Sequence, residues 1–333
     1  MLFSGTPRQA DATLRAMKHV ATAGGERALT DPDRVALAAA HHIVFRGRGE
    51  LDPDALPDID PDGLAAALEG DTTDAQHCAA FLAVMATIDG VVDAERIASA
   101  TGYVDALGLD EPYLHDLGDL AHHRLAEVRA DIGRRNVRSF TGAWLDEGID
   151  AWLMVYRDHP DPQLHERYES LASCAPGTFG RAFHDFYLLN GFAYPGVPES
   201  ANEQFTTPHD SAHVLSGYDT SLQGELLVST FTAGMHPDDA ITAHILPVII
   251  SWHLGIELAD FAGSSTGSLQ PRKFWVAWDR GDHLTGDTLA PDWDFWAHTE
   301  LPLDEMRAAM SVPRLDPADA ADGKYPDWYK PTA

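Results

Sequence analysis

Two histidines and a glutamate form the most chemically specific pattern in this chain of 333 residues. His209 and His213 are four positions apart, and eleven residues separate His213 from Glu225. Side chains four positions apart lie on the same face of a helix, so both imidazoles can reach one metal ion. The chain has 17 histidines, but no other two are spaced in this way. Imidazole and carboxylate groups together suit zinc, iron, cobalt or manganese.

A break in the helix is needed to bring Glu225 to the two histidines. On one continuous helix Glu225 would lie about 18 Å from His213, which is too far to share an ion. Gly217 is expected to end the first helix, and a second helix is expected from residue 222 to residue 233. His213 and Glu225 then lie about one turn on either side of the bend, so the break makes the cluster possible.

The start of the first helix determines where Asp210 points. Thr207 is expected to cap this helix with Pro208 in its first turn, where proline is tolerated. Asp210 follows His209 directly and points about 100° away from it on an ideal helix. Asp210 becomes a ligand if the first turn is distorted, and otherwise it orients an imidazole. The predicted metal-binding and catalytic residues are therefore His209, Asp210, His213 and Glu225.

Several segments around this pattern share one resemblance. They are the His209-Asp210-x-x-His213 motif with Glu225, and residues 175–183, 214–218, 277–281 and 301–307. Together they resemble the coenzyme Q biosynthesis family often called "coenzyme Q four", over about residues 171–315. Ser211 and Ala212 depart from that family, which commonly has an aromatic residue before the second histidine. The additional N-terminal half of this chain is a second departure.

This resemblance implies decarboxylation, or oxidative decarboxylation, of a prenylated aromatic acid in quinone biosynthesis. It implies Zn²⁺ as the expected metal, and Fe²⁺, Co²⁺ or Mn²⁺ accept the same ligands. The alternative is a non-catalytic lipid-binding or scaffold protein in which a metal stabilises the helices. Metal-assisted hydrolysis is a third interpretation. A catalytic site predicts an open coordination position, whereas a structural metal predicts four protein ligands.

The charge of the chain limits its partners. Acidic residues outnumber lysine and arginine by 52 to 23, which gives a net charge of -29. Such a surface repels nucleic acid and anionic membranes, and it favours cationic or neutral partners. An apolar prenylated molecule or lipid is the partner that the resemblance implies. Self-association and peripheral contact with a membrane are compatible with the sequence.

Cysteine content and hydropathy point to the cytoplasm. Cys78 and Cys174 are the two cysteines, far apart, so a disulfide framework is excluded and a reducing compartment fits. The N-terminus lacks the apolar core of a signal peptide. The most apolar stretch, residues 240–262, carries five histidine, proline or acidic residues. We expect a buried helix there rather than a membrane-spanning one.

The sequence predicts an all-α protein with two helical domains. One covers residues 1–150 and the other, with the metal site, covers residues 165–320, with the boundary near 140–165. Strand signals are scarce. Helices are expected to start at Asp31, as the cap of the first of them, and at Thr178, and to cover residues 73–88, 94–107 and 110–132.

An acidic turn in the first half is a second candidate site. Asp89, Asp93 and Glu95 lie between two helices rich in small residues. This turn resembles the tellurite-resistance TerB-like helical domain over about residues 30–130, some members of which are thought to bind metal through acidic residues. Turn formation and helix capping explain the same acids without a metal, and we favour that interpretation.

Other polar and aromatic residues are expected to be structural. His253 and Glu257 are four apart in the apolar stretch, where a satisfied buried pair is favoured over a proton relay. His184 and the neighbouring Asp185 are interpreted as structural. A set of tryptophans is expected in the core, with some of its members lining an apolar pocket: Trp275, Trp278, Trp293 and Trp296.

Overall fold

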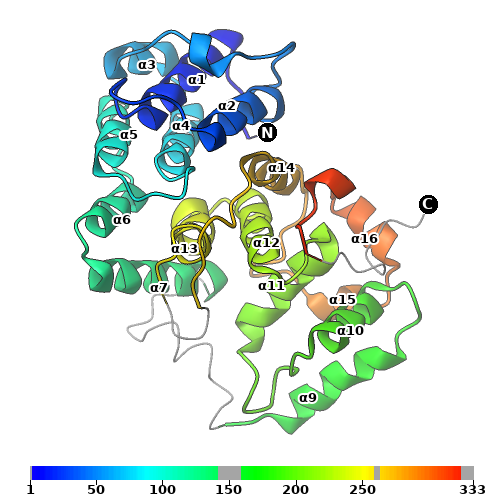
Figure 1. Ribbon diagram of the computed structural model, residues 1–333. Coiled ribbons are helices and arrows are strands. Elements are labelled where there is room, and N and C mark those ends of the chain that lie inside the picture. The colour runs from blue at the N-terminus through cyan, green and yellow to red at the C-terminus, as the bar shows by residue number, and fades with distance from the viewer. Residues whose placement is uncertain (1, 142–158, 259–262, 324–333) are drawn as a thin grey trace. The chain divides into compact units, whose positions relative to one another are not determined.

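The computed structural model describes residues 2–141, 159–258 and 263–323 (Figure 1). Within these residues the chain forms helices without a β-strand, which confirms the all-α prediction. The chain divides into two compact units. Unit 1 comprises residues 1–131 and 246–279, and unit 2 comprises residues 132–245 and 280–333. The predicted domain boundary near 140–165 lies largely outside the described residues.

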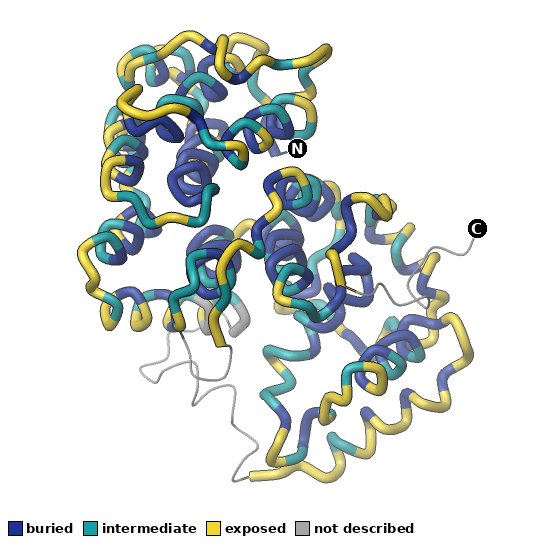
Figure 2. The backbone as a smooth tube through the Cα atoms, in the orientation of Figure 1, coloured by how far each residue is buried: buried dark blue, intermediate teal, exposed yellow. Residues whose placement is uncertain are grey.

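Unit 1 is a helical bundle around one deeply buried helix. The buried helix is α4 (Thr72–Met85), whose residues from Cys78 to Met85 are all buried (Figure 2). Many of these residues are alanines, so neighbouring helices can approach closely. Helix α4 packs against α1 (Pro7–Ala21), α3 (Pro61–Leu68) and α5 (Ala94–Ala106), and unit 1 also contains α2 (Asp31–Ile43) and α6 (Pro112–Ala121). From later in the chain, unit 1 receives α13 (Leu246–Trp252) and most of α14 (Pro271–Asp282).

Two helix boundaries in the first half differ from the prediction. Thr30 rather than Asp31 caps α2, because the Thr30 hydroxyl and the Asp33 side chain form a capping box. The helix expected over 110–132 is interrupted by a turn at His123, whose φ of 60° is left-handed. A separate helix, α7, runs over Leu125–Thr141 and continues through Gly133. A glycine inside a helix costs only about 1 kcal/mol, so it is a weak stop signal.

The acidic turn before α5 binds arginines within unit 1. Asp93 caps α5 by accepting hydrogen bonds from the backbone N–H groups of Glu95 and Arg96. Arg27 forms ion pairs with both Asp93 and Glu95. Asp89 pairs with Arg96 at 3.1 Å. These contacts agree with capping and turn formation, and they neutralise carboxylates that a metal would need.

The apolar stretch 240–262 is helical and largely buried only as far as Trp252, so the predicted buried helix is confirmed for residues 240–252 alone. A π-helical turn, η3 (Ala240–Ile245), precedes α13, and the helix ends at Trp252. His253 is buried, and it contacts the Ile88 carbonyl and the Leu269 N–H. Glu257 is exposed and beyond the helix, so the predicted pair does not form. Residues 259–262 lie outside the described part of the chain.

Unit 2 carries the predicted metal residues. Its helices are α9 (Pro162–Glu169), α10 (Phe179–Asn190), α11 (Glu203–Ser216), α12 (Leu222–Met235), α15 (Phe295–His298) and α16 (Leu303–Ala309). Thr178 caps α10, as the sequence predicts. Helices α10, α11 and α12 pack in succession, with α11 against both neighbours (Figure 1). The buried aromatic residues of α10 form much of this core: Phe179, Phe183, Phe186 and Tyr187.

The buried histidine of η3 is expected to make unit 2 sensitive to acid. Burial, aided by the positive charge of His236, lowers the pKa of His244 from 6.5 to about 3. The unfolded chain binds this proton below pH 6.5 and the folded chain does not, so stability falls as the pH drops from 6.5 towards 3. The loss should reach about 2 to 3 kcal/mol at pH 4.5.

This effect can be measured by urea denaturation of the wild type and of His244→Gln at pH 7 and pH 4.5. The variant has no imidazole to protonate, so its stability should decrease less on acidification. Equal losses in the two proteins would show that His244 does not contribute.

In the described part of the chain, no helix combines the length and the apolar character needed to cross a membrane.

Candidate metal centre

The first helix of the candidate site begins earlier than predicted. Asn202 caps α11, accepting a hydrogen bond from the backbone N–H of Gln204 at 2.8 Å. Thr207 is therefore not the cap, and Pro208 lies inside the helix. A proline in this position has no N–H to donate to the carbonyl of Gln204. Strong capping at Asn202 lets the helix form on both sides of the proline.

The predicted bend between the two helices is confirmed. Gly217 ends α11 with a φ of 82°, the left-handed conformation that glycine adopts without strain. Ser221 caps α12 by accepting a hydrogen bond from the Gly224 N–H at 3.1 Å. A Cβ atom on Gly224 would lie 2.1 Å from the Asp219 carbonyl oxygen, so this position needs glycine. The helix continues through Gly234 to Met235, slightly beyond the predicted end.

Two arginines from the end of the chain hold the bend in place. The Arg280 guanidinium donates to the Ser216 carbonyl at 2.9 Å and to the Pro313 carbonyl. Arg307 donates to the carbonyls of Val214 and Leu215. Cationic donors at a helix C-terminus satisfy carbonyls that have no helical partner. The sequence did not assign this role to either arginine.

Three ligand atoms converge across the bend. The Nε2 atoms of His209 and His213 lie 3.2 Å apart. Glu225 Oε2 lies 3.2 Å from His209 Nε2 and 3.4 Å from His213 Nε2. These three residues, called the triad below, are therefore brought together as the sequence predicts. His213 is 1% exposed, whereas the side chains of His209 and Glu225 are 18% and 20% exposed, so the triad is accessible from one side.

Neighbouring oxygens orient the ligands. His213 Nδ1 lies 3.0 Å from the Tyr218 carbonyl oxygen. A carbonyl only accepts hydrogen bonds, so Nδ1 carries the proton, and the Nε2 lone pair of a neutral His213 faces the triad. The buried Asp210 accepts a hydrogen bond from the Tyr187 hydroxyl at 2.6 Å. One ligand atom from each of His209, Asp210 and His213 lies within 4.8 Å of the others.

The histidines and the glutamate of the triad stabilise one another's charged forms. Burial alone would lower the pKa of His213, but the Glu225 carboxylate raises it to about 9. Burial opposes ionisation of Glu225, and the two histidines outweigh it and hold its pKa well below the usual range. Burial raises the pKa of Asp210. Protons and a metal ion would therefore compete for the same histidine atoms.

A cavity of about 850 Å³ lies within unit 2 next to the N-terminal half of α11. Thr207 and Pro208, directly before His209, line this cavity. Three aromatic side chains form an apolar part of its wall, namely Trp293, Phe295 and Trp296. The volume is in the usual range for small-molecule sites. The sequence anticipated tryptophans in a pocket wall, but it did not locate the cavity.

The remaining tryptophans have structural roles, and so do His184 and Asp185. Trp275 is fully buried in unit 1, where it contacts Phe81, and Trp278 stacks on it. His184 hydrogen-bonds the Tyr194 hydroxyl at 2.6 Å, and Asp185 pairs with Arg181.

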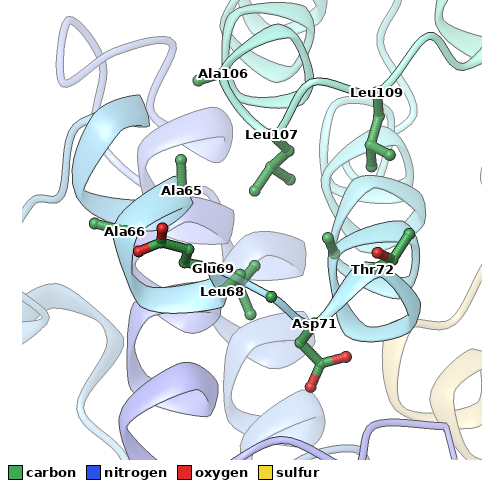
Figure 3. Close-up of a pocket in the computed structure, with 11 residues that line it drawn as sticks. Ala65, Ala66, Leu68, Glu69, Asp71, Thr72, Ala106, Leu107 and Leu109 are labelled. Atoms are coloured by element: carbon green, nitrogen blue, oxygen red, sulfur yellow. The ribbon is translucent and has the colours of Figure 1, made fainter.

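A second depression, in unit 1, is lined by small and apolar residues together with Glu69, Asp71 and Thr72 (Figure 3). It measures about 420 Å³, and Leu107 and Leu109 line it opposite Ala65 and Leu68. Its lining includes neither a histidine nor an arginine. The carboxylate of Asp71, also in the lining, is occupied in capping α4.

A serine segment in unit 1 has hydrolase-like spacing without the matching structure. Residues Gly263 to Gly267 read Gly-Ser-Ser-Thr-Gly, the G-x-S-x-G spacing of a nucleophile elbow. That motif requires a sharp turn from a strand into a helix. Here the segment is a loop in which the Ser265 N–H donates to the Ser251 carbonyl. It gives no support to hydrolysis.

The chain matches no protein-family model, no curated protein and no solved structure.

Proposed function

We propose that the triad binds a divalent metal ion, with Zn²⁺ as the preferred metal and Fe²⁺, Co²⁺ or Mn²⁺ as substitutes. The separation of its three ligand atoms, 3.2, 3.2 and 3.4 Å, is the observation that supports this proposal. Ligand atoms bound tetrahedrally at 2.0–2.1 Å lie about 3.3 Å from one another. The fixed tautomer of His213 is also typical of a metal ligand.

We propose further that the protein is an enzyme that removes the carboxyl group from a prenylated aromatic acid in quinone biosynthesis, with or without oxidation of the ring. The resemblance of residues 171–315 supports this reaction. The partial exposure of His209 and Glu225 supports a coordination position that substrate can reach. When bound, the metal supplies Lewis-acid stabilisation of negative charge on carboxylate or phenolate oxygens. The proposed location is the cytoplasm, with peripheral contact to the membrane that holds prenylated molecules.

A non-catalytic metal-stabilised protein is the second candidate, and the position of Asp210 favours it. With Asp210 as fourth ligand, the site would be closed, as in structural zinc sites. The hydrogen bond from Tyr187 instead favours an orienting role for this carboxylate. The two functions therefore differ in whether Asp210 binds the metal directly.

Elemental analysis of the purified wild type, His213→Ala and Glu225→Ala tests the metal. We expect about one metal ion per wild-type chain and none in either variant. Equal content in all three proteins would overturn the assignment. Lipid extracts of a deletion strain test the reaction, because a carboxylated ring precursor should accumulate. An unchanged quinone profile would contradict the quinone pathway while leaving the metal site intact.

A further inference from the structure

A histidine outside the triad lies on the wall of the large cavity of unit 2. His236 ends α12 and is 8% exposed. Its Nδ1 lies 2.7 Å from a carboxylate oxygen of Asp287. Since a carboxylate accepts hydrogen bonds, Nδ1 carries a proton that it donates to Asp287. Nε2 has no hydrogen-bond partner among the described residues, so it is available to a molecule in the cavity.

Asp287 and Thr288 connect His236 to α11. Asp287 binds His236, and the hydroxyl of Thr288 donates to the Pro208 carbonyl at 3.1 Å. Pro208 directly precedes His209 of the triad. Both Pro208 and Thr288 line the cavity together with His236. One cavity is therefore lined both by His236 and by Pro208, the residue before His209, while the triad itself is not in its lining.

The surroundings of His236 favour its protonated form. Burial lowers its pKa, but the hydrogen bond and charge of Asp287, with the charges of Asp238 and Asp239, raise it. On the π-helical turn, the His244 ring lies 6.0 Å away and stays neutral at physiological pH because burial lowers its pKa. Arg138, also on the cavity wall, pairs with Asp239 at 3.9 Å. The net effect is a raised pKa for His236 beside an aromatic cavity.

The distribution of groups in the cavity would orient an aromatic acid. The ring fits against Trp293, Phe295 and Trp296. Acidic side chains occupy the wall as well, namely Glu203, Asp238, Asp239 and Asp294. They repel a carboxylate, so the acid group of a bound molecule should point away from them.

We propose that His236 is the general acid of the reaction and that Asp287 is its positioning residue. This inference rests on the proposed decarboxylase function. The bond between the ring carbon and the carboxylate breaks, and its electron pair stays on that carbon. His236 Nε2 gives its proton to the same carbon, CO₂ leaves, and His236 regains a proton from solvent. The step requires no oxidant.

The first test uses the binding of 4-hydroxybenzoic acid to the metal-loaded wild type. Histidine ring resonances are recorded by NMR, and the His236 signal is assigned by its absence in His236→Gln. A saturating concentration of the probe should shift the His236 signal. His184, which pairs with Tyr194 and does not line the cavity, serves as the internal control. An unmoved His236 signal would overturn the proposal, whether or not turnover is observed.

The second test uses turnover of the same probe, labelled with ¹³C in its carboxyl group. His236→Gln should lose about 100-fold or more of kcat with little change in KM. Asp287→Asn should lose less kcat. As the pH rises, its rate should begin to fall at a lower pH than that of the wild type, because the His236 pKa drops without the carboxylate. Both variants should keep the metal content of the wild type. Wild-type kcat in His236→Gln would overturn the proposal. A wild type without metal would instead contradict the proposed function.

Discussion

Replacing Glu225 with glutamine is expected to weaken zinc binding by more than about 100-fold. Glu225 Oε2 lies within 3.4 Å of both triad histidines, so it is the one anionic group that can complete the site from α12. Glutamine preserves the shape of the side chain but removes the charge. Changes to groups that only orient ligands already cost about 10–100-fold in metal affinity, and loss of a ligand should cost more. Competition with a chromophoric chelator measures the affinity.

Two further variants sharpen this test. Glu305→Gln changes an exposed glutamate on α16 and should leave zinc affinity unchanged. Asp210→Asn should cost about 10–100-fold if this carboxylate only orients the site, and as much as Glu225→Gln if it binds the ion. Equal affinities in the wild type and Glu225→Gln would contradict the triad.

Metal binding should also be visible as stability. At a free zinc concentration about 1,000 times Kd, binding contributes about 4 kcal/mol to the folded wild type. At the same zinc concentration a site weakened about 100-fold contributes only about 1.4 kcal/mol, so removal of zinc with a chelator should lower the melting temperature of the wild type much more than that of Glu225→Gln.

Local signals made the candidate site predictable from the sequence. Gly217 is a reliable helix stop because its left-handed conformation suits glycine. The four-residue spacing of His209 and His213 fixes their common face on the helix. Once the bend is known, Glu225 follows from the length of the connection. The helical class could be predicted for the same reason, since capping residues such as Asp93 and Thr178 are adjacent to the helices that they start.

Contacts between distant residues could not be predicted in this way. The Tyr187 hydroxyl reaches Asp210 from another helix, and Arg280 reaches Ser216 across 64 positions of the chain. The dyad of His236 and Asp287 likewise joins residues 51 positions apart. Hydrophobicity also failed to reveal where the stretch 240–262 stops being helical, because the segment after Trp252 stays apolar, with Leu254, Ile256 and Leu258. The sequence therefore predicted the residues of the triad better than the neighbouring groups that contact them.

The buried ion cluster of unit 1 is expected to give the largest single loss of stability. Arg96 is 2% exposed and Asp33 is fully buried. Two nitrogens of Arg96 lie 3.1 and 2.9 Å from the two oxygens of Asp33, and Asp89 pairs with the same guanidinium at 3.1 Å. This bidentate contact joins α2 to α5. Its charges were removed from water during folding, so each depends on the others for compensation.

Arg96→Met should therefore lower the free energy of unfolding by about 3–5 kcal/mol, since the buried Asp33 loses its cationic partner. Arg27→Met is the matched control, because its side chain is 46% exposed and pairs with the acidic turn of the same unit. An exposed pair contributes about 1 kcal/mol or less. Urea denaturation followed by circular dichroism measures both variants. Similar losses in the two would mean that the cluster is solvated, and that α2 and α5 are held together by apolar packing instead.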